Sequence, residues 1–432
     1  MSELRNRIAG RVRLAGDEGF EDARRPWNLA VEQPVHAVVE AATADDVAEV
    51  VRYARDTGLA VAPQASGHGA SGDVEGVILL RTGRLDDVRV DPGARTARVG
   101  AGVRWARLLE AVSPYGLTGV AGSSGAVTVA GYTLGGGLGW FSRRYGFAAR
   151  SVRAFEVVDA DGERGRVTAD SDPGLFWALR GGGGEFALVT AIELDLHPAP
   201  ALYGGRVLWP ADKAPEVLAA FREITATAPE ELTVWFDLLR FPGAPPTVAV
   251  DATYLGDAAE ARELLRPLDR IGGAISDGRA ELPVAALPSI TAEPTDPGAG
   301  LSRAELLTGL DDVAGVLLDG PLDPLLSVQL RHLGGALARP SGTAAGHLAE
   351  PYLLYMFGLA LDPALAAAVD ARQGEIAGRL AASATGRKPY TFLRPGERAE
   401  LAFAADDLAR LRELKRRHDP RDLFRANYPV SR

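Results

Sequence analysis

Cysteine is absent from this sequence of 432 residues. Its absence excludes disulfide bonds, cysteine-based metal sites and a cysteine nucleophile. Long apolar runs are missing too, and without about 18 consecutive apolar residues we expect no membrane-spanning helix. The segment 1–7 is polar and lacks the apolar centre of a secretion signal, so we expect a cytoplasmic protein without a membrane partner.

Positive charge is outweighed by negative charge. The chain has 47 lysines and arginines and 57 aspartates and glutamates, which gives a formal net charge of −10. Proteins that bind nucleic acids normally present a basic surface, so we expect no nucleic-acid partner. The content of 47% hydrophobic and 24% charged residues is ordinary for a folded globular chain.

The first 200 residues combine short strands, single helices and long glycine-rich loops. A helix is predicted from Thr43 to Gly58, because Thr43 and Asp46 have the spacing of a capping box and glycine commonly ends a helix. Strands are predicted at 59–62, 77–80, 97–99, 155–158 and 188–196. Because strands and helices do not alternate regularly, the pattern predicts an α+β domain rather than a doubly wound sheet.

The proline-rich stretch 197–200 is a candidate domain boundary. Beyond it, the hydrophobic pattern predicts strands at 233–239, 247–254 and 352–359, and helices at 211–225, 257–267 and 363–383. Proline and glycine at 242–246 and 288–300 predict loops, and the last 30 residues begin with a helix.

Glycine is abundant, with 50 residues, and it is concentrated in the first half of the chain. It clusters at 67–72, at 116–146 and at 181–184. Glycine permits positive φ angles and lets backbone N–H groups approach an anion closely, so three clusters indicate a large phosphate-bearing ligand. The alternative interpretation is that these segments only form turns.

The segment 67–72 matches the pattern G-x-G-x-x-G of dinucleotide-binding folds. That fingerprint requires a helix to begin at the loop, but here another apolar strand follows at once. We therefore reject a nicotinamide-dinucleotide site of that type. His68 lies between two glycines of this loop, and it is either a surface turn residue or a nucleophile that carries a covalent cofactor bond.

Four segments carry specific motifs in a fixed order. They are PQASGHG at 63–69, GSSGAVTVAGYTLGGGLGW at 122–140, FWALRGGGGEFALVT at 176–190 and DPRDLFRAN at 419–427. Together they resemble the berberine-bridge-enzyme-like branch of the vanillyl-alcohol-oxidase family, whose members are FAD-linked oxidoreductases with a PCMH-type FAD-binding domain. The resemblance extends over nearly the whole chain.

The resemblance implies an α+β fold in two parts. Residues 1–198 would form the FAD-binding domain, made of two α+β subdomains, and 396–432 would be a C-terminal segment that returns to it. Residues 199–395 would form a substrate-binding domain with an antiparallel sheet covered by helices.

The resemblance also implies the FAD site. The loop 64–72 would wrap the pyrophosphate, residues 122–139 would line the isoalloxazine and ribityl groups, and His68 would bond covalently to the flavin 8α-methyl carbon. We expect no metal ion. The residues expected to bind FAD are Gln64, Ala65, Ser66, Gly67, His68, Gly69, Ser71, Gly122, Ser123, Ser124, Val127, Val129, Gly131, Tyr132, Gly135, Gly136, Gly139, Val189 and Asn427.

The sequence departs from the family pattern at several positions. Ser124 stands where bicovalent members carry cysteine, so a covalent flavin could be linked only through His68. Glu185 and Arg150 replace the usual asparagine and aspartate, and a carboxylate at 185 would repel a phosphate unless it turns away or pairs. Val127 matches a small residue associated with oxygen access, which favours an oxidase.

The family's usual Tyr-x-Asn-Tyr motif is incomplete. Its nearest match is Tyr390-Thr-Phe-Leu393, in which the second tyrosine, the usual base, is missing. Candidates for the catalytic base are Tyr390, which we favour, Tyr355 and His332, with Arg331 as a charge partner that could lower a tyrosine pKa.

The first functional hypothesis is an oxidase with covalent FAD that oxidises an alcohol, sugar or polycyclic natural product of secondary metabolism and passes electrons to O2. A flavin dehydrogenase with another acceptor and a non-redox scaffold, either an isomerase or cyclase or a binding protein, stay open as alternatives. The expected partners are the small-molecule substrate and O2, and the chain would be a monomer or homodimer.

Overall fold

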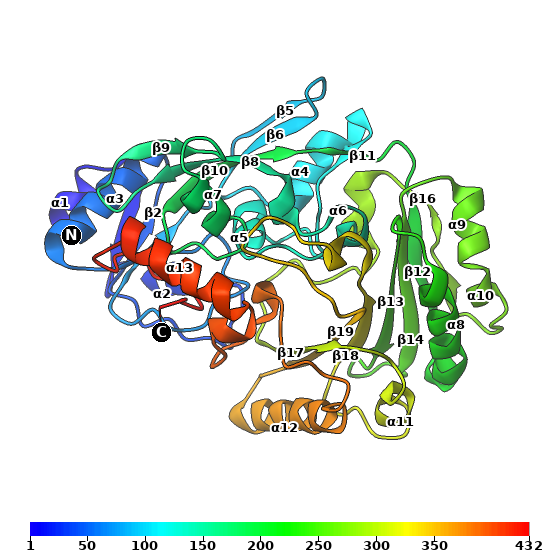
Figure 1. Cartoon of the computed structure of the whole chain (residues 1–432). Coiled ribbons are helices and arrows are strands. Elements are labelled where there is room, and N and C mark those ends of the chain that lie inside the picture. The colour runs from blue at the N-terminus through cyan, green and yellow to red at the C-terminus, as the bar shows by residue number, and fades with distance from the viewer. Residues whose placement is uncertain (432) are drawn as a thin grey trace.

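The computed structural model of the chain describes residues 1–431, which adopt an α+β fold. Figure 1 shows two smaller sheets on one side of the molecule and a large antiparallel sheet on the other, with glycine-rich segments between them. The α+β fold class predicted from the sequence is confirmed.

The first sheet is mixed. In spatial order its strands are β1 (Arg11–Leu14), β2 (Ala37–Glu40), β4 (Ile78–Arg81) and β3 (Val61–Pro63). β2 and β3 both run parallel to β4, and α3 (Ala44–Thr57) is the crossover that parallel strands require. Thr43 and Asp46 form a complete capping box, and Gly58 ends α3 in the left-handed conformation, as predicted. Two short helices, α1 (Ser2–Arg5) and α2 (Phe20–Arg24), flank this sheet.

The second sheet is antiparallel. In spatial order its strands are β5 (Val88–Asp91), β6 (Thr96–Gly100), β10 (Leu188–Asp195), β8 (Val152–Val158) and β9 (Arg164–Val167). A small pair, β7 (Leu117–Thr118) and β11 (His197–Pro198), lies beside it. The helices of this half are α4 (Trp105–Val112), α5 (Val129–Leu134), α6 (Ser142–Tyr145) and α7 (Pro173–Leu179).

The third sheet has eight strands. They are β15 (Ser276–Asp277), β12 (Tyr203–Pro210), β14 (Thr247–Tyr254), β13 (Leu232–Leu239), β18 (Ser327–His332), β19 (Tyr352–Leu359) and β17 (Gly300–Leu307), with β16 (Ala280–Glu281) paired to β12. The helices after α7 are α8 (Ala214–Thr227), α9 (Ala258–Leu264), α10 (Arg266–Asp269), α11 (Val313–Leu317), α12 (Pro363–Arg379) and α13 (Ala405–His418).

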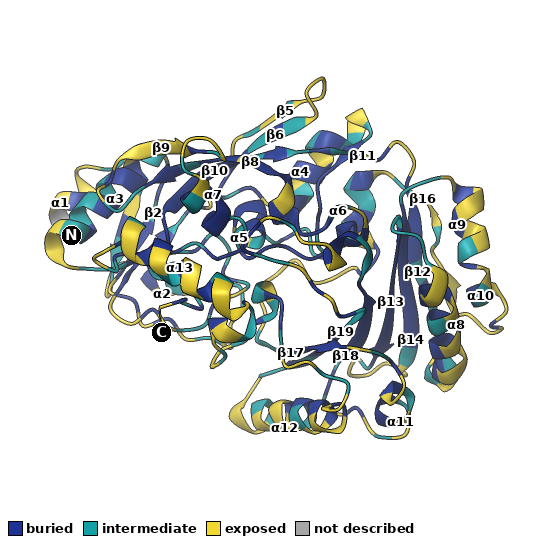
Figure 2. Cartoon of the chain, in the orientation of Figure 1, coloured by how far each residue is buried: buried dark blue, intermediate teal, exposed yellow. Residues whose placement is uncertain are grey.

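The two faces of the third sheet differ because side chains alternate along a strand. On β13, Val234, Phe236 and Leu238 point to the face covered by α8 and belong to an apolar core. Trp235 and Asp237 point to the opposite face, toward the first half of the chain. Figure 2 shows that the central strands β13 and β14 of this sheet are buried and that α8, α9 and α12 expose their outer sides.

The C-terminal segment returns to the first half of the molecule. α13 packs against α7, and the chain beyond it runs beside β3, where Val61 and Phe424 form a parallel bridge. Figure 1 shows α13 lying over the side of the molecule that carries both small sheets.

Several elements differ from the sequence predictions. β12 was missed because Gly204 and Gly205 weaken the strand pattern. Both are needed there, since a Cβ at Gly205 would lie 2.2 Å from the carbonyl oxygen of Gly278. β17 begins at Gly300, where the proline-rich loop was predicted to end. The predicted helix 257–267 is broken into α9 and α10, and Pro267 lies in the first turn of α10.

Among residues 1–431, no helix is both long enough and apolar enough to cross a membrane.

Candidate active site

The first glycine loop joins β3 to β4 without a helix, which agrees with the rejection of the dinucleotide fingerprint. Gly67 has a φ of 85°, and a Cβ there would lie 2.8 Å from Pro26. Gln64 is buried at the base of the loop, where its amide oxygen accepts a 2.7 Å hydrogen bond from Arg81. The loop is therefore a fixed structure rather than a loose surface turn.

His68 is held within this loop by two contacts. Its ring stacks on Trp27 at 4.3 Å between centroids, and its Nδ1 lies 2.8 Å from Ser66 Oγ. Burial, with a smaller effect of Arg104, lowers the pKa of His68 to about 4, so the ring is neutral at pH 7. Its Nε2 is buried and has no hydrogen-bond partner.

The second glycine segment surrounds Tyr132, which lies on α5. A Cβ at Gly139 would lie 2.0 Å from the carbonyl oxygen of Ala121 and 2.6 Å from the Tyr132 hydroxyl, so this position requires glycine. The Tyr132 hydroxyl is buried without a partner, and burial raises the pKa of Tyr132 well above its usual value. The ring lies edge-on to Trp105 at 5.5 Å.

The third glycine segment meets Tyr390. Gly181 and Gly183 have positive φ angles of 108° and 94°. A Cβ at Gly183 would lie 2.8 Å from the Tyr390 hydroxyl, and one at Gly135 would lie 3.2 Å from the same ring. Tyr390 therefore lies between the second and third glycine segments.

The other residues predicted for the FAD site lie on the same three segments and the tail. Ser124 Oγ accepts a local 3.3 Å hydrogen bond from the Ala126 amide, and Val189 is buried on β10. Ser71 and Asn427 line one pocket between the first loop and the C-terminal segment. The remaining predicted residues lie in or directly beside the first two glycine segments; they are Ala65, Gly69, Gly122, Ser123, Val127, Val129, Gly131 and Gly136.

Glu185 does not remain free to repel a phosphate. Its carboxylate accepts a 2.7 Å hydrogen bond from the Val430 amide and lies 3.9 Å from Lys415 Nζ. Burial nevertheless raises the pKa of Glu185 to about 7, against the opposing effect of Lys415. Glu185 thus turns away toward the C-terminal segment, while Arg150 is exposed.

Arg331 and Tyr355 lie on the face of the third sheet that carries Trp235 and Asp237, which we call the polar face. The Arg331 guanidinium lies 4.1 Å from the Trp235 ring and 5.4 Å from the Tyr355 ring. Arg331 acts to lower the pKa of Tyr355, as predicted for a charge partner, but burial outweighs it and the net shift is upward. Phe392 lies edge-on to Tyr355 at 5.8 Å.

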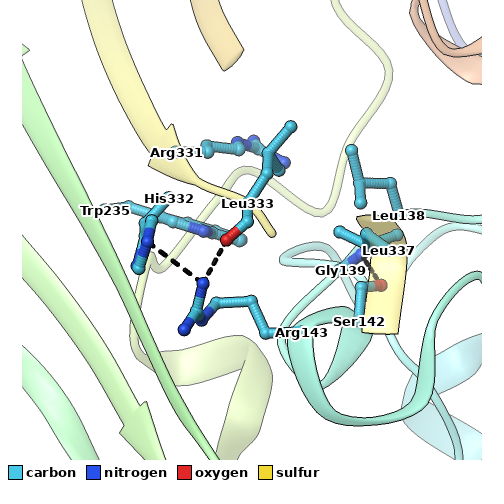
Figure 3. A pocket seen from close by; sticks show the side chains of 9 residues that line it. All are labelled: Leu138, Gly139, Ser142, Arg143, Trp235, Arg331, His332, Leu333 and Leu337. Carbon is cyan, nitrogen blue, oxygen red and sulfur yellow. Dashed lines mark hydrogen bonds between the residues drawn. The ribbon is translucent and has the colours of Figure 1, made fainter. Parts of the chain in front are cut away.

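His332 and Tyr390 are engaged elsewhere. His332 Nε2 lies 3.0 Å from Arg143 Nη1, and burial together with Arg143 lowers the pKa of His332 to about 3 (Figure 3). The Tyr390 hydroxyl donates a 3.1 Å hydrogen bond to the carbonyl oxygen of Tyr428, and its pKa is raised by burial and by Glu185. Of the three candidates for the base, Tyr355 is the one that lies beside Arg331.

Sequence reasoning missed several residues of this face. Trp140, which lies within the second glycine segment, stacks on Trp235 at 3.7 Å and so joins the two halves of the molecule. Asp237 and Gln329 are buried and hydrogen-bonded to each other at 3.2 Å. The available signal was a polar residue within an otherwise apolar strand, as in LTVWFDLL at 232–239.

The residues present fit FAD. Buried polar groups normally have a partner, yet unpartnered ones gather on the glycine segments and the residues beside them. They are His68 Nε2, Trp105 Nε1, Tyr132 Oη, Thr133 Oγ1, Trp140 Nε1, Arg180 Nε and Glu185 Oε2. Such donors and acceptors, on glycine-rich backbone, suit a large cofactor with many polar atoms. Others, such as Thr253 Oγ1 and His418 Nε2, lie on other parts of the chain. In the described part of the chain, no group of three or more histidine, aspartate or glutamate side chains is placed to hold a metal ion.

Comparisons with known proteins agree with this assignment. Residues 35–168 match the family described as "FAD binding domain". The chain is 30% identical over 295 residues to (R)-6-hydroxynicotine oxidase of Paenarthrobacter nicotinovorans, an alignment that covers 66% of this chain and 64% of that relative. The chain thus spans somewhat less than two thirds of that relative's length.

Solved structures match over almost the full chain. The 6-hydroxy-D-nicotine oxidase of Arthrobacter nicotinovorans superposes with a TM-score of 0.86 at 25% identity, covering 98% of each chain. The BBE-like 1 protein of Physcomitrella patens has a TM-score of 0.86 at 20% identity and covers 100% of this chain and 99% of that one, which shows the fold. Residues 35–168 therefore belong to an FAD-binding domain of the PCMH type, and the chain as a whole has the berberine-bridge-enzyme-like fold.

Proposed function

We propose that this chain is an FAD-dependent oxidase with the flavin attached through His68 alone. It would oxidise an alcohol group of a small molecule, a sugar or a polycyclic natural product, and use O2 as the electron acceptor. The similarity to (R)-6-hydroxynicotine oxidase supports an oxidase. The single observation that carries the proposal is the free Nε2 of His68 within a fixed glycine loop.

The surroundings of His68 suit a nucleophile. The ring is neutral because burial lowers its pKa to about 4. When Nδ1 donates its proton to Ser66 Oγ, the lone pair of the ring lies on Nε2, which has no other partner. The stack on Trp27 fixes the direction of that lone pair. With no cysteine in the chain, a second covalent link of the kind known in bicovalent relatives cannot form.

The flavin, when bound, supplies hydride acceptance and the transfer of electrons to O2. The protein must hold the substrate and take the hydroxyl proton. Tyr355 is the best-placed base, since it lies on the polar face beside the cation of Arg331. In the balanced reaction the C–H bond is lost as hydride, the hydroxyl loses a proton, the alcohol becomes a carbonyl and O2 becomes hydrogen peroxide.

The covalent attachment is tested by denaturing the purified protein and running it on a gel. Flavin fluorescence should stay with the polypeptide, and His68→Ala should release it. His347→Ala is the matched control, because His347 is exposed and should leave the attachment unchanged. A colourless wild-type protein would overturn the cofactor assignment.

The acceptor is tested separately. Flavin that has been photoreduced without oxygen should reoxidise rapidly in air, with one hydrogen peroxide formed per flavin. Slow reoxidation in air, together with rapid reoxidation by a quinone, would replace the oxidase by a dehydrogenase.

A further inference from the structure

The polar face of the third sheet contains a buried cation that is only partly hydrogen-bonded. Arg331 is 7% exposed, and its Nε donates a 2.5 Å hydrogen bond to Gln329 Oε1. Among the described residues, no acceptor is hydrogen-bonded to its terminal nitrogens and no carboxylate forms an ion pair with it. A buried charge without a partner is costly, so such a group indicates a ligand.

Arg331 is held in place from two sides. Its guanidinium stacks on Trp235 at 4.1 Å, and Trp235 stacks on Trp140 at 3.7 Å. The Gln329 side chain, which accepts from Arg331, donates a 3.2 Å hydrogen bond to Asp237. These contacts fix the plane of the guanidinium and direct its hydrogen-bonding capacity away from Gln329.

Nearby carboxylates do not neutralise this cation. Asp251 is engaged by Arg206 through hydrogen bonds of 2.6 and 2.7 Å. Asp237 accepts from Ser327 and Gln329, and burial, reinforced by Asp251, raises its pKa to about 7. The charge of Glu293 acts electrostatically to raise the pKa of Arg331, but the Glu293 side chain is exposed and forms no ion pair with Arg331 among the described residues.

Aromatic and aliphatic side chains make up most of the surroundings of the Arg331 guanidinium. Its guanidinium lies near Trp235, Tyr355 and Phe392. It also lines a small pocket with Leu138, Leu333 and Leu337, between the second glycine segment and the third sheet, as Figure 3 shows. The same pocket also contains Arg143 and His332, but the Arg143 nitrogens already donate to the backbone carbonyls of Leu232, Ala228 and Pro229, and His332 Nε2 lies 3.0 Å from Arg143 Nη1. Arg331 is therefore the guanidinium with donors left for a ligand. A phosphate would need further donors, whereas a planar carboxylate on an apolar ring suits this single guanidinium.

We propose that Arg331 binds a carboxylate of the substrate, so that the substrate is a carboxylate-bearing alcohol with a cyclic or aromatic body. The inference rests on the proposed function, because it names the substrate class of the same site. Gln329 is a positioning residue that fixes the guanidinium, and Trp235 supports its plane.

Benzoate is the probe for this site, and benzamide is its neutral counterpart of the same shape. Holoprotein is titrated with each, and binding is measured by calorimetry and by the change in the flavin absorption spectrum. Wild type should bind benzoate in preference to benzamide. Arg331→Gln should weaken benzoate binding about 10-fold or more, as expected for hydrogen bonds to a charge, and leave benzamide binding unchanged.

Further variants separate binding from folding. Arg331→Lys keeps the cation and should retain most benzoate binding, while Gln329→Leu should weaken benzoate binding several-fold without changing benzamide binding. Arg150→Gln, at an exposed position, is the control and should bind as wild type. Equal benzoate binding by wild type and Arg331→Gln, or no preference of the wild type for benzoate, would overturn the inference. If the protein carries flavin and reacts with O2 as an oxidase but does not bind benzoate, the inference about Arg331 is wrong and the proposed function still stands.

Discussion

Burial dominates the ionisation of the functional side chains of this protein. It lowers the pKa of His68 to about 4 and raises that of Glu185 to about 7, although Lys415 opposes the second shift. Both groups are therefore driven toward their neutral forms. For His68 this leaves a lone pair available at neutral pH, and for Glu185 it makes stability depend on pH.

Glu185→Gln should reduce the dependence of the protein's stability on pH. The folded-state pKa of Glu185 lies above its ordinary value of 4.5, so the folded state binds the proton more tightly and its stability falls as pH rises from about 4.5 through 7. Urea unfolding of both proteins at pH 5 and pH 8 measures this. The loss of stability between the two pH values should be smaller in the variant, and an identical loss in both would contradict the assigned pKa.

Elements set by local signals were predictable from the sequence, and those set by distant pairing were not. The limits of α3 followed from Thr43, Asp46 and Gly58, which act within a few residues of one another. The meeting of Trp235 with Arg331 depends on the pairing of β13 with β18, nearly a hundred positions apart in the chain, and no local pattern encodes it. The glycine segments could be recognised because the clustering of glycine is visible in the sequence. The side chains that pack against them, such as Tyr390, could not be predicted from it.

The second glycine segment should tolerate no side chain at Gly139. Gly139→Ala would place a Cβ 2.0 Å from the Ala121 carbonyl oxygen, and overpacking of this kind typically costs about 1–3 kcal/mol. Thermal unfolding and the flavin content of the purified variant measure the effect, and both should fall. Gly83→Ala is the control, since a Cβ there meets nothing within 4 Å. Equal flavin content and stability in the two variants would contradict this packing.

At the scale of the whole molecule, buried polar contacts attach the C-terminal segment to the first half of the chain. Lys415 is 3% exposed and donates hydrogen bonds to Asp419 at 2.6 Å, to the Phe424 carbonyl at 2.9 Å and to the Glu185 carbonyl at 3.0 Å. One buried ammonium group thus connects α13, the tail beside β3 and the third glycine segment.

Lys415→Met should weaken this connection strongly. Removing one partner of a buried ion pair leaves Asp419 uncompensated, which typically costs about 3–5 kcal/mol. Urea unfolding and the rate of flavin loss report the damage. Lys213→Met removes an exposed pair with Glu216 and should have little effect. If Lys415→Met were as stable as Lys213→Met, the hydrogen bonds of Lys415 would not be what holds the tail in place.

We propose that FAD is attached to His68, and peptide mapping shows whether the bond exists and where it is. Trypsin should release residues 56–81 as one peptide, because no lysine or arginine lies between Arg55 and Arg81, and His68 is its single histidine. After denaturation and digestion, flavin absorbance should stay with this peptide, and fragmentation should place the flavin on His68. Flavin released free on denaturation, or found on another peptide, would contradict a bond to His68.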